Sequence, residues 1–134
     1  MLARPKSTLS LRHIALFIKN FEQSLHFYTE ILGMTIEWKP DEDNIYLTFG
    51  SDNLALHRAT GEFEWPSHQH LAHLGFILKT PDEVDAWYNF LQQHSVIIKA
   101  PVRNHRDGAR SFYCLDPDNN VIQMIYHPPI ADKL

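Results

Sequence analysis

The 134-residue sequence lacks the features that mark secreted, membrane and nucleic-acid-binding proteins. It has one cysteine, Cys114, so no disulfide can form within the chain, and this favours a reducing cytoplasmic location. No apolar run approaches the roughly 20 residues that a membrane-spanning helix needs, and the N-terminal residues have no apolar stretch typical of a secretory signal. The net charge is −4 with scattered Lys and Arg, which argues against a nucleic-acid partner. We therefore expect a cytoplasmic protein whose partner is a small molecule.

The composition is otherwise that of a globular protein. Hydrophobic residues make up 44% and charged residues 21% of the chain, which are ordinary values. The length predicts a single domain over residues 1–134 that can bury a core. Nine histidines are the one unusual count, and they raise the prior for metal chemistry modestly.

An internal repeat organises the chain. The segment RHIALFIKN begins at Arg12, and AHLGFILKT begins at Ala72 in the same register. His13 therefore matches His73, and the correspondence runs on to aromatic positions further along. Both segments are rich in β-branched and aromatic residues, which predicts a strand at the start of each copy.

A helix is predicted after each of these strands. Asn20 with Gln23, and Thr80 with Glu83, have the spacing of capping boxes. Gly33 is expected to end the first helix in a left-handed turn. Apolar residues recur at helical spacing in both segments; they are Phe21, Leu25, Tyr28 and Leu32, then Val84, Trp87, Tyr88 and Leu91.

Three strands are predicted after each helix, separated by turn-forming residues. They are Met34–Trp38, Ile45–Phe49 and Leu54–Arg58, then Val96–Lys99, Ser111–Leu115 and Val121–Tyr126. The fold class is thus α+β, with two tandem βαβββ modules over about residues 11–60 and 71–127 and a linker at 61–70. Helices on one face of each sheet would leave the other as a concave surface around a central site. The alternative is a ferredoxin-like or other α+β sandwich whose internal similarity arose by chance.

The paired modules, the strand-opening His13 and His73, and the closing segment SFYCLDPDNNVIQM resemble the vicinal-oxygen-chelate superfamily. That group includes glyoxalase I, extradiol dioxygenases, fosfomycin-resistance transferases and bleomycin-binding proteins. The resemblance spans about residues 11–127. It is strong for the fold and weak for the reaction, because the scaffold supports unrelated chemistries.

The resemblance implies a metal site on the first and last strands of the modules. The ligands carried over are His13, His73 and Gln123, where Gln123 stands in the place of a usual Glu. An amide oxygen can coordinate a metal but brings no negative charge, which weakens the case for iron held by two histidines and a carboxylate. The alternative is that Gln123 is a lost ligand in a metal-free protein. Asn119-Asn120 replaces the usual glycine-containing turn before this strand, which asparagine tolerates because it can visit the left-handed region.

Two further residues are candidates for catalysis. Ala55 occupies the place of a second acidic ligand in glyoxalase I, and His57 lies two residues later on the same strand face. Tyr113 lies ten residues before Gln123, and His105, Tyr113 and Gln123 have a spacing similar to a His, Tyr and Glu set in extradiol dioxygenases. Tyr113 or His57 would transfer a proton or stabilise an oxyanion. The alternatives are a solvent or pocket-lining His57 and a core Tyr113.

These residues predict an enzyme that uses a divalent metal ion (Zn, Ni, Mn or Fe) to act on a small oxygen-rich molecule. Its reaction would be of the glyoxalase-like lyase or isomerase type, or of the dioxygenase type. The alternative is a non-catalytic small-molecule-binding protein of the bleomycin-resistance type, favoured by the loss of acids at Ala55 and Gln123. A homodimer is expected because sheet edges and apolar flanks are commonly buried by pairing. The site could be completed within one chain or between two.

Overall fold

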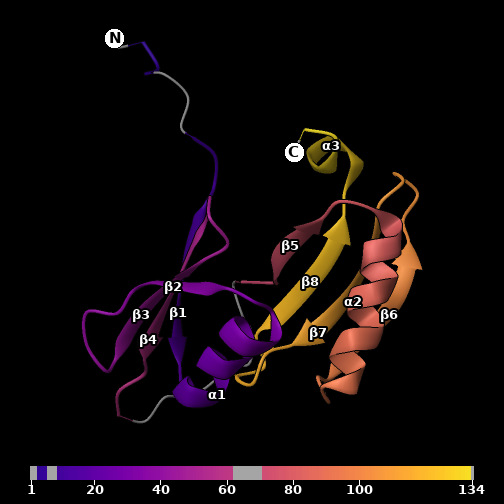
Figure 1. Ribbon diagram of the computed structural model, residues 1–134. Helices are drawn as coiled ribbons and strands as arrows, with labels where there is room; N and C mark the ends of the chain where they lie inside the picture. The colour runs from indigo at the N-terminus through magenta and orange to yellow at the C-terminus, as the bar shows by residue number, and fades with distance from the viewer. Residues whose placement is uncertain (1–2, 6–8, 62–70, 134) are drawn as a thin grey trace. The chain divides into compact units, whose positions relative to one another are not determined.

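The computed structural model describes residues 3–5, 9–61 and 71–133. Contacts divide the chain into two units, Met1–Gly61 and Glu62–Leu134. Each unit contains one four-stranded sheet and at least one helical segment (Figure 1). The predicted linker, apart from residue 61, lies outside the described residues. No helix in the part of the chain that the structure describes is long and apolar enough to cross a membrane.

Unit 1 has the element order strand, helix and three strands. Its elements are β1 (His13–Ile18), α1 (Phe21–His26), the π-helical turn η1 (Phe27–Ile31), β2 (Thr35–Trp38), β3 (Asn44–Thr48) and β4 (Asn53–Arg58). The strand order in the sheet is β1-β4-β3-β2. Strands β1 and β4 are parallel, and the other pairs are antiparallel.

Unit 2 repeats this topology. Its elements are β5 (Leu74–Leu78), α2 (Pro81–Gln93), β6 (Ile98–Asn104), β7 (Arg110–Leu115), β8 (Val121–Tyr126) and a short helix α3 (Pro128–Ala131). The strand order is β5-β8-β7-β6, with β5 parallel to β8. The two units therefore confirm the predicted α+β class and its two βαβββ modules. Helix α3 follows the second module and was not predicted.

Most strand boundaries lie within one residue of the predicted ones, and β6 is the exception. The prediction Val96–Lys99 was wrong, because β6 begins at Ile98 and runs to Asn104. Its pairing with β7 shifts register between Ile98 and Ala100 and again before Arg103. Pro101 lies inside this irregular stretch, and an edge strand tolerates a proline that a central strand would exclude.

The two helix starts differ although their sequences are similar. Glu83 N–H donates to Thr80 Oγ1 (3.2 Å), and Thr80 N–H donates to Glu83 Oε2 (3.3 Å), so the predicted capping box of α2 is confirmed. The capping box predicted for Asn20 and Gln23 was wrong. Asn20 has φ −93° and ψ 70° and makes no side-chain cap hydrogen bond, whereas a capping residue adopts the extended conformation of Thr80.

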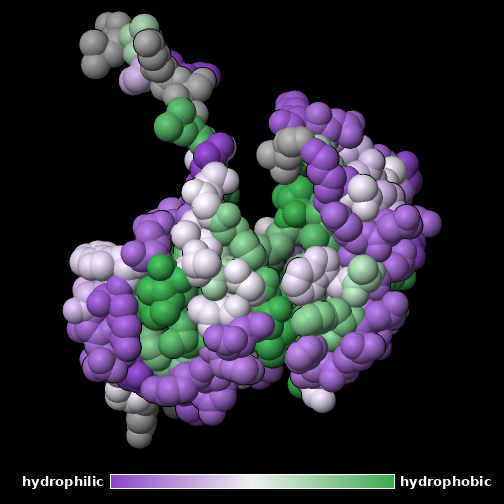
Figure 2. Space-filling view, in the orientation of Figure 1, coloured by the Kyte–Doolittle hydropathy of each residue, from purple (hydrophilic) through white to green (hydrophobic). Residues whose placement is uncertain are grey.

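Each sheet packs one face against its helix. In β1 the alternate residues Leu16 and Ile18 are buried, while Phe17 between them is 66% exposed. The helical segments supply Phe21 and Tyr28 in unit 1 and Val84 and Leu91 in unit 2 to the buried cores, and Leu32, directly after η1, is buried as well. The outward side of α2 is mostly hydrophilic (Figure 2). The predicted apolar stripes thus face the sheets, as helical periodicity requires.

The opposite side of each sheet is called its open face. It carries His13, Ala15, Phe17, Asn44, Tyr46, Asn53, Ala55 and His57 in unit 1, and Gly75, Ser111, Tyr113 and Gln123 in unit 2. The turns that lead to these strands have the expected conformations. Gly33 has φ +96°, which confirms the left-handed position predicted for it. Of the two asparagines in the turn before β8, Asn119 takes the left-handed conformation, with φ +66°.

Candidate functional site

The open face of unit 2 is built around Gln123. The sheet register places Gln123 of β8 between Gly75 of β5 and Tyr113 of β7. Gln123 is 9% exposed, so its amide must be hydrogen-bonded or bind a ligand to offset the cost of burial.

The two ends of the Gln123 amide differ in their partners. Its Nε2 donates to Tyr113 Oη (3.1 Å) and to Ser111 Oγ (3.3 Å). The Oε1 atom accepts no hydrogen bond from any residue that the structure describes. This oxygen lies on the side of Gly75. A Cβ placed on that glycine would be 3.8 Å from the Gln123 Oε1 atom. Because the NH₂ group is occupied, the carbonyl oxygen is the end that can coordinate a ligand.

Tyr113 links Gln123 to His73. The phenolic oxygen accepts the hydrogen bond from Gln123, so its own O–H remains a donor for a bound molecule. The ring of His73 packs edge-on against the Tyr113 ring, with centroids 5.2 Å apart. His73 is exposed and lies one residue before β5, so its ring nitrogens are accessible. Two predicted ligands of unit 2, His73 and Gln123, therefore both contact Tyr113.

His105 joins the same network through a residue that the sequence did not indicate. His105 Nε2 is 2.7 Å from Ser111 Oγ, and Ser111 also accepts the hydrogen bond from Gln123. Arg103 lies 3.4 Å from His105 Nδ1. Ser111 precedes Tyr113 by two residues on one strand, so alternation alone could have placed both on the same face.

In unit 1 the predicted histidines are each hydrogen-bonded to an asparagine. His13 Nδ1 is 2.7 Å from Asn53 Oδ1, and His57 Nδ1 is 2.6 Å from Asn44 Oδ1. In the sheet, His13 of β1 pairs with Asn53 of β4. Asn53 lies four residues before His57 on the same strand. This separation corresponds to about 13 Å along a strand, so the two histidines lie at different positions on the open face of unit 1.

Ala55 is the counterpart of Gln123 in the first module. It pairs with Ala15 of β1 and Tyr46 of β3, as Gln123 pairs with Gly75 and Tyr113. Ala55 is fully buried and offers no metal ligand. The two modules thus keep the tyrosine at equivalent positions but differ at the ligand position.

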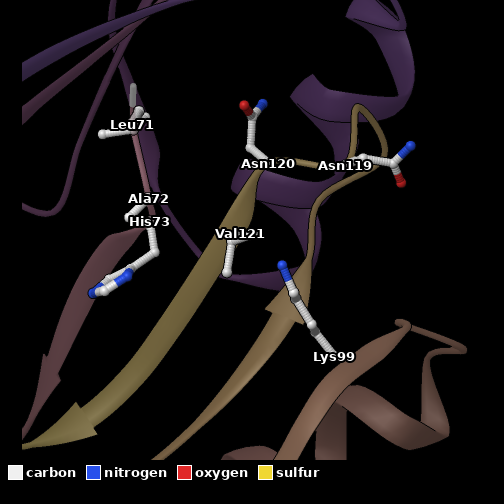
Figure 3. A pocket seen from close by; sticks show the side chains of 7 residues that line it. All are labelled: Leu71, Ala72, His73, Lys99, Asn119, Asn120 and Val121. Carbon is white, nitrogen blue, oxygen red and sulfur yellow. The ribbon is translucent and has the colours of Figure 1, made fainter. Parts of the chain in front are cut away.

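A pocket of about 200 Å³ adjoins His73 in unit 2. Its lining residues are Leu71, Ala72, His73, Lys99, Asn119, Asn120 and Val121. Figure 3 shows the Lys99 amine extended toward Val121, with the His73 ring beyond Val121 and the Asn119 side chain directed away. His73 is thus one of the residues that line this pocket.

The two arginines at strand ends are already paired. Arg58 contacts Glu22 (2.9 Å) and Asp43 (3.0 Å), and Arg110 contacts Asp85 (2.7 Å). The hydrogen bond to Asp85 raises the pKa of Arg110, and the bond to Glu22 raises that of Arg58. Neither guanidinium is therefore the first choice as an anion-binding group.

No three His, Cys, Asp or Glu side chains among the described residues gather as a metal site. The predicted ligand set differs from such a cluster in two respects. It includes the amide of Gln123, and it draws His13 from unit 1 and the other two ligands from unit 2.

The chain matches one protein-family model and is similar to several known proteins. The model of the Glyoxalase/Bleomycin resistance protein/Dioxygenase superfamily matches residues 10–124. The Glyoxalase domain-containing protein RDO1 of Mycosarcoma maydis is 31% identical over 132 residues, which cover 90% of this chain and 70% of that protein. Metallothiol transferase FosB of Staphylococcus haemolyticus is 29% identical over 115 residues, covering 85% and 81%.

Solved structures with the same fold include an integron cassette protein, VCH_CASS1, from the mobile metagenome of V. Cholerae. It superposes with a TM-score of 0.69 and 27% identity, over 92% of this chain and 99% of that one. Lactoylglutathione lyase from Agrobacterium tumefaciens superposes with a TM-score of 0.70 over 90% and 96% of the two chains. At 19% identity, that second likeness concerns the fold alone.

Proposed function

Because the chain belongs to the Glyoxalase/Bleomycin resistance protein/Dioxygenase superfamily, we propose that it is a divalent-metal-dependent enzyme acting on a small oxygen-rich molecule. Relatives with the names metallothiol transferase and glutathione transferase are enzymes, which supports catalysis here. The proposed ligands are His13, His73 and Gln123. The observation that carries the proposal is the Gln123 amide, whose NH₂ is held by two hydroxyls while its oxygen remains without a partner among the described residues.

The donor set fits a divalent ion of the borderline type. Two imidazoles and one amide oxygen suit zinc or nickel, and manganese less well, while the common iron triad needs a carboxylate. When bound, such an ion supplies a Lewis acid that polarises a substrate oxygen. A lyase or isomerase reaction of the glyoxalase type therefore fits better than dioxygenase chemistry.

The protein's own groups would handle the proton and the developing charge. Tyr113 has an O–H that it can donate, because its oxygen already accepts from Gln123, and such a donor stabilises an oxyanion. His57 would serve as the base, through the ring nitrogen that Asn44 leaves free. The pocket beside His73 would admit the substrate.

The test is the metal content of untagged protein purified without chelator. We expect about one divalent ion per chain in the wild type and none in the variant with His13→Ala and His73→Ala. The matched control is His26→Ala with His94→Ala, which removes two exposed histidines outside the proposed ligand set and should leave the ion in place. Absence of metal from the wild type, even after incubation with excess divalent ions, would leave a binding protein of the bleomycin-resistance type as the function.

A further inference from the structure

The two histidines on the open face of unit 1 make the same contact through the same atom. In each, Nδ1 lies within hydrogen-bond distance of an asparagine Oδ1, at 2.7 Å for His13 and 2.6 Å for His57. Nε2 of neither ring has a hydrogen-bond partner among the described residues. Which nitrogen carries the proton depends on whether the asparagine presents its oxygen or its NH₂.

A carboxylate determines the orientation of each amide. Asn53 Nδ2 donates to Glu37 Oε1 (3.2 Å). Asn44 Nδ2 donates to Asp41 Oδ1 (2.8 Å) and Oδ2 (3.1 Å). An ionised carboxylate accepts hydrogen bonds and cannot donate them, so the NH₂ group must face it. The amide oxygen then faces the imidazole, which has to donate from Nδ1.

We propose that Glu37 with Asn53, and Asp41 with Asn44, are positioning residues that hold His13 and His57 as Nδ1–H tautomers. Histidine in water favours the other tautomer, with the proton on Nε2. The two carboxylate–amide pairs reverse that preference and present an unprotonated Nε2 on the open face of unit 1. A metal ligand and a general base both need that lone pair, and the assignment of these two roles rests on the proposed function.

The surroundings of His57 favour a role separate from that of His13. The rings of Phe17 and Tyr46 each lie 6.0 Å from the His57 ring between centroids. Nε2 of His57 is therefore a hydrogen-bond acceptor among aromatic side chains. It suits a hydroxyl or an acidified C–H of a substrate, whereas His13 is exposed and bonded to Asn53 at the start of β1.

Unit 2 provides an internal control. By sheet register, Val121 occupies the place of Asn53, and Ser111 occupies the place of Asn44. Valine offers no acceptor, and no described residue hydrogen-bonds to the His73 ring, which contacts Tyr113. His73 should therefore show the tautomer that histidine favours in water.

The test is ¹⁵N NMR of the imidazole nitrogens in metal-free protein at a pH where the histidines are neutral. We expect His13 and His57 to carry the proton on Nδ1, and His73 to carry it mainly on Nε2. Asn53→Leu should convert His13 alone to the Nε2–H form, and Asn44→Leu should convert His57 alone. Asn53→Asp and Asn44→Asp retain an acceptor and should preserve the Nδ1–H form, which excludes a general loss of structure as the cause.

Metal affinity provides the second readout. Asn53→Leu should weaken metal binding by about 10- to 100-fold, the usual effect of removing the hydrogen-bond partner of a ligating histidine, whereas Asn44→Leu should leave it unchanged. Nε2–H tautomers at His13 and His57 in the wild type would overturn this inference even if the protein binds metal. Nδ1–H tautomers in a protein that binds no metal would instead reject the proposed function and preserve the positioning role.

Discussion

Gln123 presents a neutral oxygen at a position where a carboxylate would add a negative charge close to the proposed ion. We expect Gln123→Glu to bind a divalent ion at least about tenfold more tightly, equivalent to about 1.4 kcal/mol. The hydroxyls of Tyr113 and Ser111, which now accept from the amide, can rotate to donate to the new carboxylate. Competition with a chromophoric chelator measures the change.

Two variants complete this experiment. Gln92→Glu adds the same charge on an exposed position of α2, so it should leave metal affinity unchanged. Gln123→Leu removes the ligand oxygen and should weaken binding. Equal affinities of Gln123→Leu and the wild type would exclude Gln123 as a ligand.

Cys114 is fully buried on β7, and burial, with a smaller contribution from the charge of Asp116, raises the pKa of its thiol to about 12. The thiolate is the reactive form, so we expect negligible reaction with a disulfide reagent at pH 8 in the folded protein. Full reaction should follow unfolding in denaturant. Rapid modification of the native protein would show that the thiol is accessible.

The same shift predicts how stability depends on pH. The folded thiol keeps its proton up to about pH 12, whereas the unfolded thiol loses it from about pH 9. Between about pH 9 and pH 12 the folded state therefore binds more protons than the unfolded state. The contribution of the thiol to the free energy of unfolding is constant below about pH 9 and falls as the pH rises above it. Urea titrations at pH 8 and pH 10 should show a larger loss for the wild type than for Cys114→Ala.

At the scale of the element, the start of α2 depends on the capping box between Thr80 and Glu83. Thr80→Ala removes the acceptor of the Glu83 N–H, and we expect it to lower the free energy of unfolding by about 1 kcal/mol. Thr80→Ser keeps the hydroxyl and should retain most of the stability. Chemical denaturation measures both, and equal stabilities of the alanine and serine variants would contradict the contribution of the cap.

The elements show which parts of the fold the sequence could predict. The repeat aligned His13 with His73 and so predicted both sheets, because strand periodicity and helix spacing are local signals. The Asn20 cap failed, since capping spacing specifies residue types and leaves the backbone conformation open. Strand β6 was too short in the prediction, because Pro101 reads as a strand end unless the strand is known to lie at a sheet edge.

The residues of the candidate site were likewise predicted only in part. Gln123 and Tyr113 were predicted from their places in the closing segment, and the sheet register brings them into contact. Ser111, Asn44 and Asn53 were missed, because short polar residues on strands are common and their partners come from other strands. Their importance depends on cross-strand neighbours, which a single sequence does not specify.

At the scale of the molecule, unit 1 exposes large apolar side chains on its edge strand β2. Ile36 is 54% exposed and Trp38 is 58% exposed, and edge strands with apolar surface favour association. We therefore expect a homodimer at micromolar concentration, with Trp38→Glu shifting it toward the monomer. Sedimentation equilibrium measures both, and Glu30→Gln at an exposed position of η1 serves as the control.

A bound metal ion should raise the stability of the folded protein. The proposed ligands are His13, His73 and Gln123, and the ion is expected to bind them in the folded state. An ion at a hundredfold excess over its dissociation constant should raise the free energy of unfolding by about 2.7 kcal/mol. His13→Ala and His73→Ala should each abolish most of this gain, while both variants remain folded without metal. Urea unfolding with and without the ion measures the effect. Full stabilisation of His13→Ala by the ion would remove His13 from the ligand set.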